Sequence, residues 1–176
     1  MSKINTYTKN RIDPCSPEEN EIIIEDIAHA LSLLCRSGGH FPSFYSVGQH
    51  SIACAKEAKA RGYSKKIQLA CLLHDASEAY IADITRPVKE KLQEYRVYEK
   101  KLQDMIYKKF IGEMLDKDET KLISLIDDAM LFHEFKFFMD ISLSDLSTEI
   151  ETSPDYNFYS FKKIENDFLE LFNELK

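Results

Sequence analysis

The chain has 176 residues, of which 44% are hydrophobic and 30% charged, and its formal net charge is −7. This mixture is typical of a globular protein and excludes a disordered chain, which combines few apolar residues with high charge. The length predicts one domain that can bury a core without disulfides or a structural metal. An acidic chain repels a phosphate backbone, so we expect no nucleic-acid partner.

The cysteines and the start of the chain bear on its location. Cys15, Cys35, Cys54 and Cys71 form no CxxC pair, and we interpret them as reduced, buried, small hydrophobic residues. The sequence opens without a charged segment followed by an apolar run, and no apolar run approaches the length of a membrane span. We therefore expect a cytoplasmic protein without a membrane partner.

Few glycines and prolines interrupt the chain, which favours helices. Residues 1–20 are polar and contain two prolines, so we expect an arm or loop there and a single helical domain over residues 21–176. Apolar residues at spacings of three and four predict the first helix over 25–36. Gly38 and Gly39 follow it, as glycine often does just past a helix.

The next two helices are marked by N-cap residues. Ser46 and Gln49 form a capping box, which satisfies free backbone N–H groups and predicts a helix to about Arg61. Ser64 predicts the start of the following helix. We expect that helix to continue to just before Asp83, because a Thr-Arg-Pro segment then interrupts it.

The second half of the chain predicts three further helices. They are expected over 88–111, from Asp118 as N-cap through His133, and over 160–175. The stretch 144–157 is expected to be a loop, and no alternating strand pattern of useful length occurs. The sequence therefore predicts an all-α, single-domain helical bundle.

An unusual group of polar residues occurs in the apolar stretch LLHDASEAYIAD at residues 72–83. On a helix, Glu78 would share a face with His74, four residues before it, and with Asp75, three before it. Burying two carboxylates and an imidazole costs several kcal/mol unless a positive charge compensates them. A divalent cation supplies that charge, and this donor set suits Mn, Fe, Co, Ni or Zn.

Other ligands must come from other helices, because one helix does not complete a metal site. His50 on the preceding helix is one candidate, and an aspartate of the Asp127-Asp128 pair is another. Asp128 is alternatively a surface acid. A lone histidine is more often a packed, surface or loop residue than a ligand, and we interpret three histidines in this way: His29, His40 and His133.

Three segments contain these residues: SVGQHS, LLHDASEAYIADITRPVK and LIDDAMLFHE. Together they resemble the HD-domain phosphohydrolases, and within them the bacterial and phage branch similar to 5′-deoxynucleotidases. The preceding EDIAHALSLLCRSGGH also resembles that branch, and the resemblance covers roughly residues 5–140. It implies a helical fold of the HD type, one divalent metal ion bound by an H…HD…D motif, and a homodimer, since the nucleotidase relatives are commonly dimers.

The resemblance also implies the metal ligands residue by residue. They are His50, His74, Asp75 and Asp127. Asp127 is preferred to Asp128 because the branch tends to place a glutamate seven residues after this ligand, and that position here is Glu134.

Four more residues complete the implied site. In the branch, Glu78 and Asp83 correspond to groups that act on the attacking water, and Arg36 corresponds to a phosphate-binding arginine. Arg86, beside Asp83, is a second phosphate-binding candidate. Elementary chemistry agrees, because a divalent cation activates water and polarises phosphoryl oxygen, a carboxyl group transfers protons, and a guanidinium fork matches phosphate. The GGHFPSFY segment departs from the characterised deoxynucleotidases, so the resemblance does not extend to nucleotide selection.

We therefore expect a metal-dependent, 5′-nucleotidase-like phosphohydrolase that hydrolyses a nucleoside 5′-monophosphate, with deoxynucleotides favoured. One alternative is an alarmone hydrolase, whose members usually carry a second acid directly after the motif glutamate, where this chain has Ala79. Another is a regulatory module that binds metal or nucleotide without turnover. Metal content together with a phosphate-release screen distinguishes the enzyme from the module.

Overall fold

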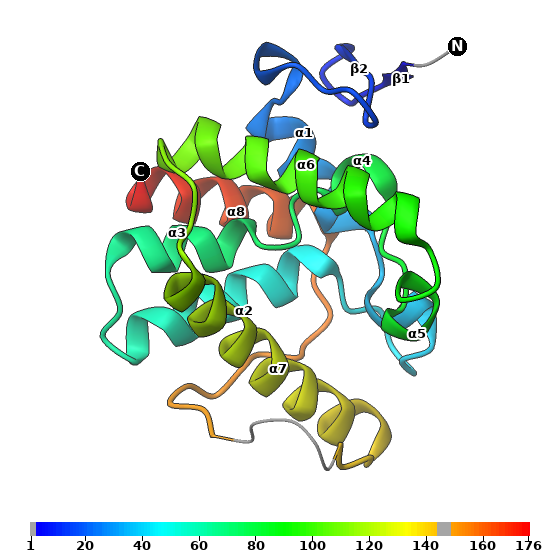
Figure 1. Ribbon diagram of the computed structural model, residues 1–176. Coiled ribbons are helices and arrows are strands. Elements are labelled where there is room, and N and C mark those ends of the chain that lie inside the picture. Colours follow the sequence, from blue (N-terminus) through cyan, green and yellow to red (C-terminus); the bar gives the residue numbers. More distant parts are fainter. Residues whose placement is uncertain (1–2, 144–148) are drawn as a thin grey trace.

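The structure is a computed structural model that describes residues 3–143 and 149–176. Apart from two short strands, the regular elements in these residues are helices, which confirms the predicted all-α fold (Figure 1). The α-helices are α1 (Ile24–Leu33), α2 (Val47–Ala60), α3 (Lys65–Leu73), α4 (Glu78–Ile81), α5 (Arg86–Lys89), α6 (Gln93–Ile111), α7 (Lys117–Met139) and α8 (Phe161–Leu175). Two 3-10 turns, η1 (Glu19–Glu21) and η2 (Arg36–Gly39), flank α1.

Helices α2 and α3 pack side by side at the centre, and α7 packs against both of them (Figure 1). Helix α8 packs against α1, α2 and α3 through a buried stripe of residues three or four apart: Ile164, Phe168, Phe172 and Leu175. Helices α1 and α2 approach closely at Gly48, where an added Cβ would lie 3.2 Å from the carbonyl of Leu31. These contacts fix the positions of α2 and α7 relative to α3, and residues on or next to these three helices form the candidate metal centre.

Local capping signals predict several helix starts correctly. The Ser46 hydroxyl accepts a hydrogen bond from the Gln49 backbone N at 3.1 Å, and Gln49 Oε1 accepts one from the Ser46 backbone N at 3.2 Å. Ser64 caps α3 as predicted, whereas the Ser160 cap of α8 is seen only in the structure. Helix α7 instead begins after Asp116, whose side chain forms a capping box that the prediction from Asp118 missed.

The first predicted helix ends three residues early, at Leu33. The chain then leaves the helix because Cys35 pairs with Ser46 in an isolated antiparallel bridge. Arg36 follows in η2, and Ser37 next to it has a left-handed backbone with φ 55°. Arg36 therefore lies on a sharp turn rather than on a helix.

The third predicted helix is interrupted. Helix α3 ends at Leu73, and α4 begins only at Glu78 after a turn. Gln103 from α6 explains the break, because its amide donates to the Leu73 carbonyl at 2.7 Å and its oxygen accepts from the Ser77 backbone N at 3.1 Å. A side chain distant in the sequence thus replaces hydrogen bonds that would continue the helix. No local signal in the sequence predicts this break.

Two further elements differ from the prediction. Helix α6 begins at Gln93, five residues late, because a separate short helix α5 precedes it. The expected N-terminal arm contains an antiparallel pair of strands, β1 (Ile4–Asn5) and β2 (Arg11–Ile12). Asp26 on α1 accepts hydrogen bonds from the Thr8 backbone N and hydroxyl, which ties this hairpin to the domain. Strands of two residues are too short to show a period-two pattern.

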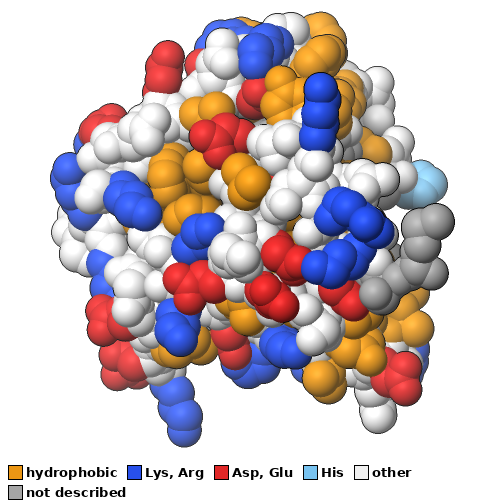
Figure 2. All heavy atoms as spheres, turned by 90° about the horizontal axis from the view of Figure 1, so that it is seen from above, with side chains coloured by type: hydrophobic (Ala, Val, Ile, Leu, Met, Phe, Trp, Pro, Cys, Tyr) orange, Lys and Arg blue, Asp and Glu red, His pale blue; other side chains and the backbone are white. Residues whose placement is uncertain are grey.

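The cysteines and the surface complete the description. Cys54 and Cys71 are free and buried, as predicted, whereas Cys15 and Cys35 are free and exposed, so the buried interpretation is wrong for these two. Within the described residues, every helix is too short or too polar to cross a membrane. On the face that Figure 2 shows, basic and acidic side chains are interspersed, as is usual for a solvated protein surface.

Candidate metal centre

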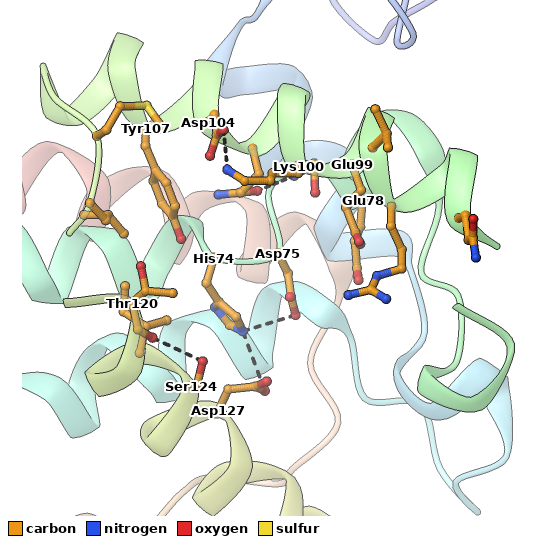
Figure 3. Close-up of a pocket in the computed structure, with 18 residues that line it drawn as sticks. His74, Asp75, Glu78, Glu99, Lys100, Asp104, Tyr107, Thr120, Ser124 and Asp127 are labelled. Atoms are coloured by element: carbon orange, nitrogen blue, oxygen red, sulfur yellow. Dashed lines mark hydrogen bonds and ion pairs between the residues drawn. The ribbon is translucent and has the colours of Figure 1, made fainter. Parts of the chain in front are cut away.

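Two histidines and two aspartates bring their donor atoms together from α2, the end of α3 and α7. The Nε2 atoms of His50 and His74 lie 3.2 Å apart. Asp127 Oδ1 lies 3.1 Å from the first and 3.7 Å from the second. Asp75 Oδ2 lies 3.9 Å and 3.3 Å from the same two atoms. Figure 3 shows His74, Asp75 and Asp127 pointing toward one another. The structure thus brings together the four residues predicted as ligands.

The Nδ1 atom of each imidazole, on the side away from the cluster, already has a hydrogen-bond partner. His50 Nδ1 lies 2.6 Å from Glu134 Oε1, and His74 Nδ1 lies 2.7 Å from the carbonyl oxygen of Cys71. Because both partners are acceptors, a proton on each Nδ1 satisfies them, and each Nε2 can then offer a lone pair to a metal ion once its own proton is released. Two lone pairs and two carboxylates this close repel one another unless positive charge lies among them.

The spacing of these donors fits a single ion. Nitrogen and oxygen ligands lie about 2.0–2.2 Å from zinc, so two ligands of one ion are at most about 4.4 Å apart. The His–His distance of 3.2 Å and the His–Asp distances of 3.1–3.9 Å all satisfy this limit. Imidazole with carboxylate suits a divalent transition metal. The cluster is therefore compatible with a metal site of the HD type.

A sulfur atom also belongs to the cluster. Cys54 Sγ lies 3.5 Å from His50 Nε2, and this sulfur and the Nε2 atoms of His50 and His74 all lie within 4.8 Å of one another. Burial raises the pKa of the Cys54 thiol to about 12. The sequence predicts Cys54 only as a small buried residue, and its one signal is its position one helical turn after His50.

The two neighbouring aspartates of α7 differ in their contacts with the cluster. Asp127 Oδ1 lies in the cluster and its Oδ2 lies 3.9 Å from Arg86 Nη2, whereas Asp128 Oδ1 accepts a hydrogen bond from that Nη2 at 3.0 Å. Successive side chains on a helix point about 100° apart, so both carboxylates cannot easily face one centre. The geometry therefore favours Asp127 as the ligand.

The remaining histidines lie outside this cluster. His29 Nδ1 pairs with Glu165 on α8, and its ring stacks on Tyr7. His40 is exposed in the turn after η2, and the His133 ring contacts Phe132.

Glu78 is a buried carboxyl beside the cluster, but it does not share a helix with His74. The break after α3 places it at the start of α4, so the face-sharing argument from the sequence is wrong in its geometry. Its Oε2 has no hydrogen-bond partner among the described residues, and its Oε1 lies 3.5 Å from Lys89 Nζ. Burial raises the pKa of Glu78 well above its ordinary value, and the Asp75 and Asp83 carboxylates raise it further.

Asp83 follows α4 in a more open position. Burial raises the pKa of Asp83 as well, although the Arg36 guanidinium opposes that shift. A buried oxygen without a partner, such as Glu78 Oε2, indicates a place for a water molecule or a ligand. The two carboxyl groups are therefore suited to proton transfer beside the donors.

Glu134 connects the cluster to Arg36. Its Oε1 holds the His50 ring, and its Oε2 accepts hydrogen bonds from Arg36 Nε at 3.3 Å and Nη2 at 3.1 Å. Burial alone would raise the pKa of Glu134, but the charges of Arg36 and His50 outweigh it and lower that pKa. Arg36 Nη1 also lies 3.6 Å from Asp75 Oδ2. A single carboxylate thus orients an imidazole of the cluster and a guanidinium.

Two cavities meet at the cluster and share Asp75, Glu78 and Asp127 as lining residues. The smaller one, about 270 Å³, also contains the predicted phosphate-binding and proton-transfer residues, together with a lysine that the sequence did not indicate: Arg36, Asp83, Arg86 and Lys89. The larger one, about 780 Å³, extends from His74 between α6 and α7 and is lined in part by Gln103 and Tyr107 (Figure 3).

We expect Glu134→Gln to weaken binding of both metal and phosphate. Glutamine has one acceptor oxygen in place of two, so it cannot hold His50 and Arg36 together. Losing an outer hydrogen bond to a metal-binding histidine typically costs about 10–100-fold in metal affinity. Calorimetric metal titration and the KM for a phosphate ester measure the two effects. Glu170→Gln, at an exposed glutamate of α8, should change neither value, and unchanged values in Glu134→Gln contradict the coupling.

Comparison with known proteins gives relatives but no activity. No protein-family model matches the chain. It is 36% identical over 110 residues to the uncharacterized protein YfdR of Escherichia coli (strain K12), a match that covers 62% of this chain and 59% of that protein. It is 40% identical over 84 residues to an uncharacterized protein of Rhodobacter capsulatus, covering 45% of this chain and 42% of that protein. The chain thus spans about half the length of the curated relatives it matches.

Proposed function

We propose that this protein is a metal-dependent phosphohydrolase of the HD type that hydrolyses nucleoside 5′-monophosphates, with deoxynucleotides favoured. The observation that carries the proposal is the convergence of His50, His74, Asp75 and Asp127, with His–His and His–Asp donor distances of 3.9 Å or less. A guanidinium lies beside these donors, as does a buried carboxylate oxygen that has no hydrogen-bond partner in residues 3–143 and 149–176. Such a set suits the hydrolysis of a charged ester better than simple metal storage.

Different side chains of the protein perform phosphate binding and proton transfer during phosphate-ester hydrolysis. Arg36, with Arg86 and Lys89 in the smaller cavity, supplies positive charge for the phosphate. A divalent cation, when bound, supplies Lewis-acid activation of water and of a phosphoryl oxygen. Positive charge near a carboxyl lowers its pKa, which lets Glu78 accept the proton of the attacking water. Asp83 then protonates the leaving sugar oxygen as the phosphorus–oxygen bond breaks.

The two cavities support a nucleotide rather than a small inorganic substrate. The smaller cavity holds the basic residues and suits one phosphate group, whereas the roughly two further negative charges of a triphosphate would need more basic residues. The larger cavity, of about 780 Å³, lies within the range of small-molecule sites and contains the Tyr107 ring and the Gln103 amide, which suit a nucleoside. We therefore place the phosphate in the smaller cavity and the nucleoside in the larger one.

A phosphate-release panel tests this function. Metal-stripped protein is reloaded with each of several divalent metals and assayed on deoxynucleoside and ribonucleoside 5′-monophosphates, a triphosphate and a guanosine tetraphosphate. We expect the highest kcat/KM on a deoxynucleoside 5′-monophosphate, abolished by chelator and restored by a transition metal. Fastest turnover of the tetraphosphate would support the alarmone hydrolase instead, and bound metal without any released phosphate would support a regulatory module.

A further inference from the structure

The proposed function leaves one donor atom of the cluster unused. Cys54 lies one turn after His50 on α2, so both side chains leave the same face of the helix. Its side chain is buried with a residue exposure of 1%, and its sulfur lies 3.5 Å from His50 Nε2. Most buried cysteines pack as small apolar residues, but this sulfur faces the donor atoms of two candidate metal-binding histidines.

The distance from this sulfur to His50 Nε2 is compatible with two ligands of one ion. With zinc–nitrogen bonds near 2.05 Å and a zinc–sulfur bond near 2.3 Å, two nitrogen ligands of one ion lie at most about 4.1 Å apart and a nitrogen and the sulfur at most about 4.4 Å apart. The corresponding distances here are 3.2 Å between His50 and His74, and 3.5 Å between His50 and Cys54. The sulfur and both nitrogens also lie within 4.8 Å of one another.

We propose that Cys54 Sγ is a further ligand of the divalent cation and makes the centre select zinc or cobalt over magnesium and manganese. The inference rests on the proposed metal centre and adds sulfur to it. Thiolate ligands favour thiophilic metals, whereas carboxylate and water alone suit magnesium and manganese. On coordination the thiol releases its proton to solvent, and no oxidation is involved.

A second buried cysteine provides a matched control. Cys71 is free and buried on α3. It lies close to the same centre, as its backbone carbonyl accepts the hydrogen bond from His74 Nδ1. Its sulfur is not part of the donor group formed by His50, Cys54 and His74. Replacing Cys71 by alanine removes a buried thiol but keeps that carbonyl.

Cobalt spectroscopy of the full chain tests the proposal without any assay of turnover. Thiolate bound to Co²⁺ gives a ligand-to-metal charge-transfer band in the near ultraviolet, whereas nitrogen and oxygen ligands do not. We expect this band in the wild type and in Cys71→Ala at one cobalt per chain, and its loss in Cys54→Ala with cobalt still bound. The preference for zinc over manganese, measured by competition, should fall at least about tenfold in Cys54→Ala, since even an outer contact is worth that much.

The outcomes separate this inference from the proposed function. Cobalt bound by the wild type without the band, and lost from His74→Ala, overturns the role of Cys54 and leaves the proposed centre standing. A wild type that binds no cobalt or zinc overturns both. A band that disappears in Cys71→Ala but persists in Cys54→Ala would show that the sulfur of Cys71 binds cobalt, and it would overturn the proposal for Cys54. Where Cys54→Ala does not fold, as judged by circular dichroism, Cys54→Ser replaces the sulfur by oxygen and must also lose the band.

Discussion

Glu78→Gln is expected to lower kcat by about 10²–10⁴-fold while the metal content stays at the wild-type level. Glutamine keeps the shape of the side chain but cannot accept a proton from water. The position is suited to that task, because Glu78 Oε2 is buried, has no hydrogen-bond partner in the part of the chain that the structure describes, and belongs to a residue that lines both cavities at the cluster.

Phosphate release and elemental analysis of the same preparations measure both quantities. Asp104→Asn is the matched control, because Asp104 lines the larger cavity but pairs with the exposed Lys100. It should keep kcat within a few-fold of the wild type. Near-normal turnover in Glu78→Gln would rule out proton transfer by this residue, and loss of metal would show that Glu78 is a ligand instead.

The second large effect is expected at Asp127. Asp127→Ala removes an oxygen that lies 3.1 Å from His50 Nε2, so we expect loss of the bound metal and of phosphate release together. Asp128→Ala should keep one metal per chain, because this carboxylate pairs with Arg86 outside the cluster. The two variants remove the same chemical group at neighbouring positions of one helix, which makes each the control of the other.

Metal stoichiometry after dialysis, followed by phosphate release with added metal, measures the difference. Asp128→Ala should show a raised KM at most, since Arg86 then loses a carboxylate partner in the smaller cavity. Loss of metal in Asp128→Ala with retention in Asp127→Ala would move the ligand by one residue and contradict the arrangement described here.

Local signals in the sequence predict the elements whose boundaries are set by nearby residues. The capping box of Ser46 and Gln49 and the N-cap Ser64 place the starts of α2 and α3 correctly. The break between α3 and α4 could not be predicted, because it depends on hydrogen bonds from Gln103 on another helix. The end of α1 depends in the same way on the bridge between Cys35 and Ser46.

In the candidate site, too, some features can be predicted from local residues and others depend on contacts between helices. The residue types and their resemblance to a known motif indicate His50, His74 and Asp75, because metal ligands must be of these types whatever the fold. The double role of Glu134 follows from the packing of α2 against α7, and the place of Cys54 near His74 follows from the packing of α2 against α3. The homodimer that the resemblance implies stays a prediction.

The claim that a divalent cation bound by these residues is required for phosphate-ester hydrolysis is tested most directly by titrating metal-stripped protein. A deoxynucleoside 5′-monophosphate is the substrate, and released phosphate is measured against added Mn²⁺, Co²⁺ or Zn²⁺. The wild type should be inactive without metal and reach full activity at one ion per chain. His74→Ala should stay inactive, whereas His29→Ala, whose histidine pairs with Glu165, should behave as the wild type. Full activity of the stripped wild type, or an unchanged titration in His74→Ala, would contradict the claim.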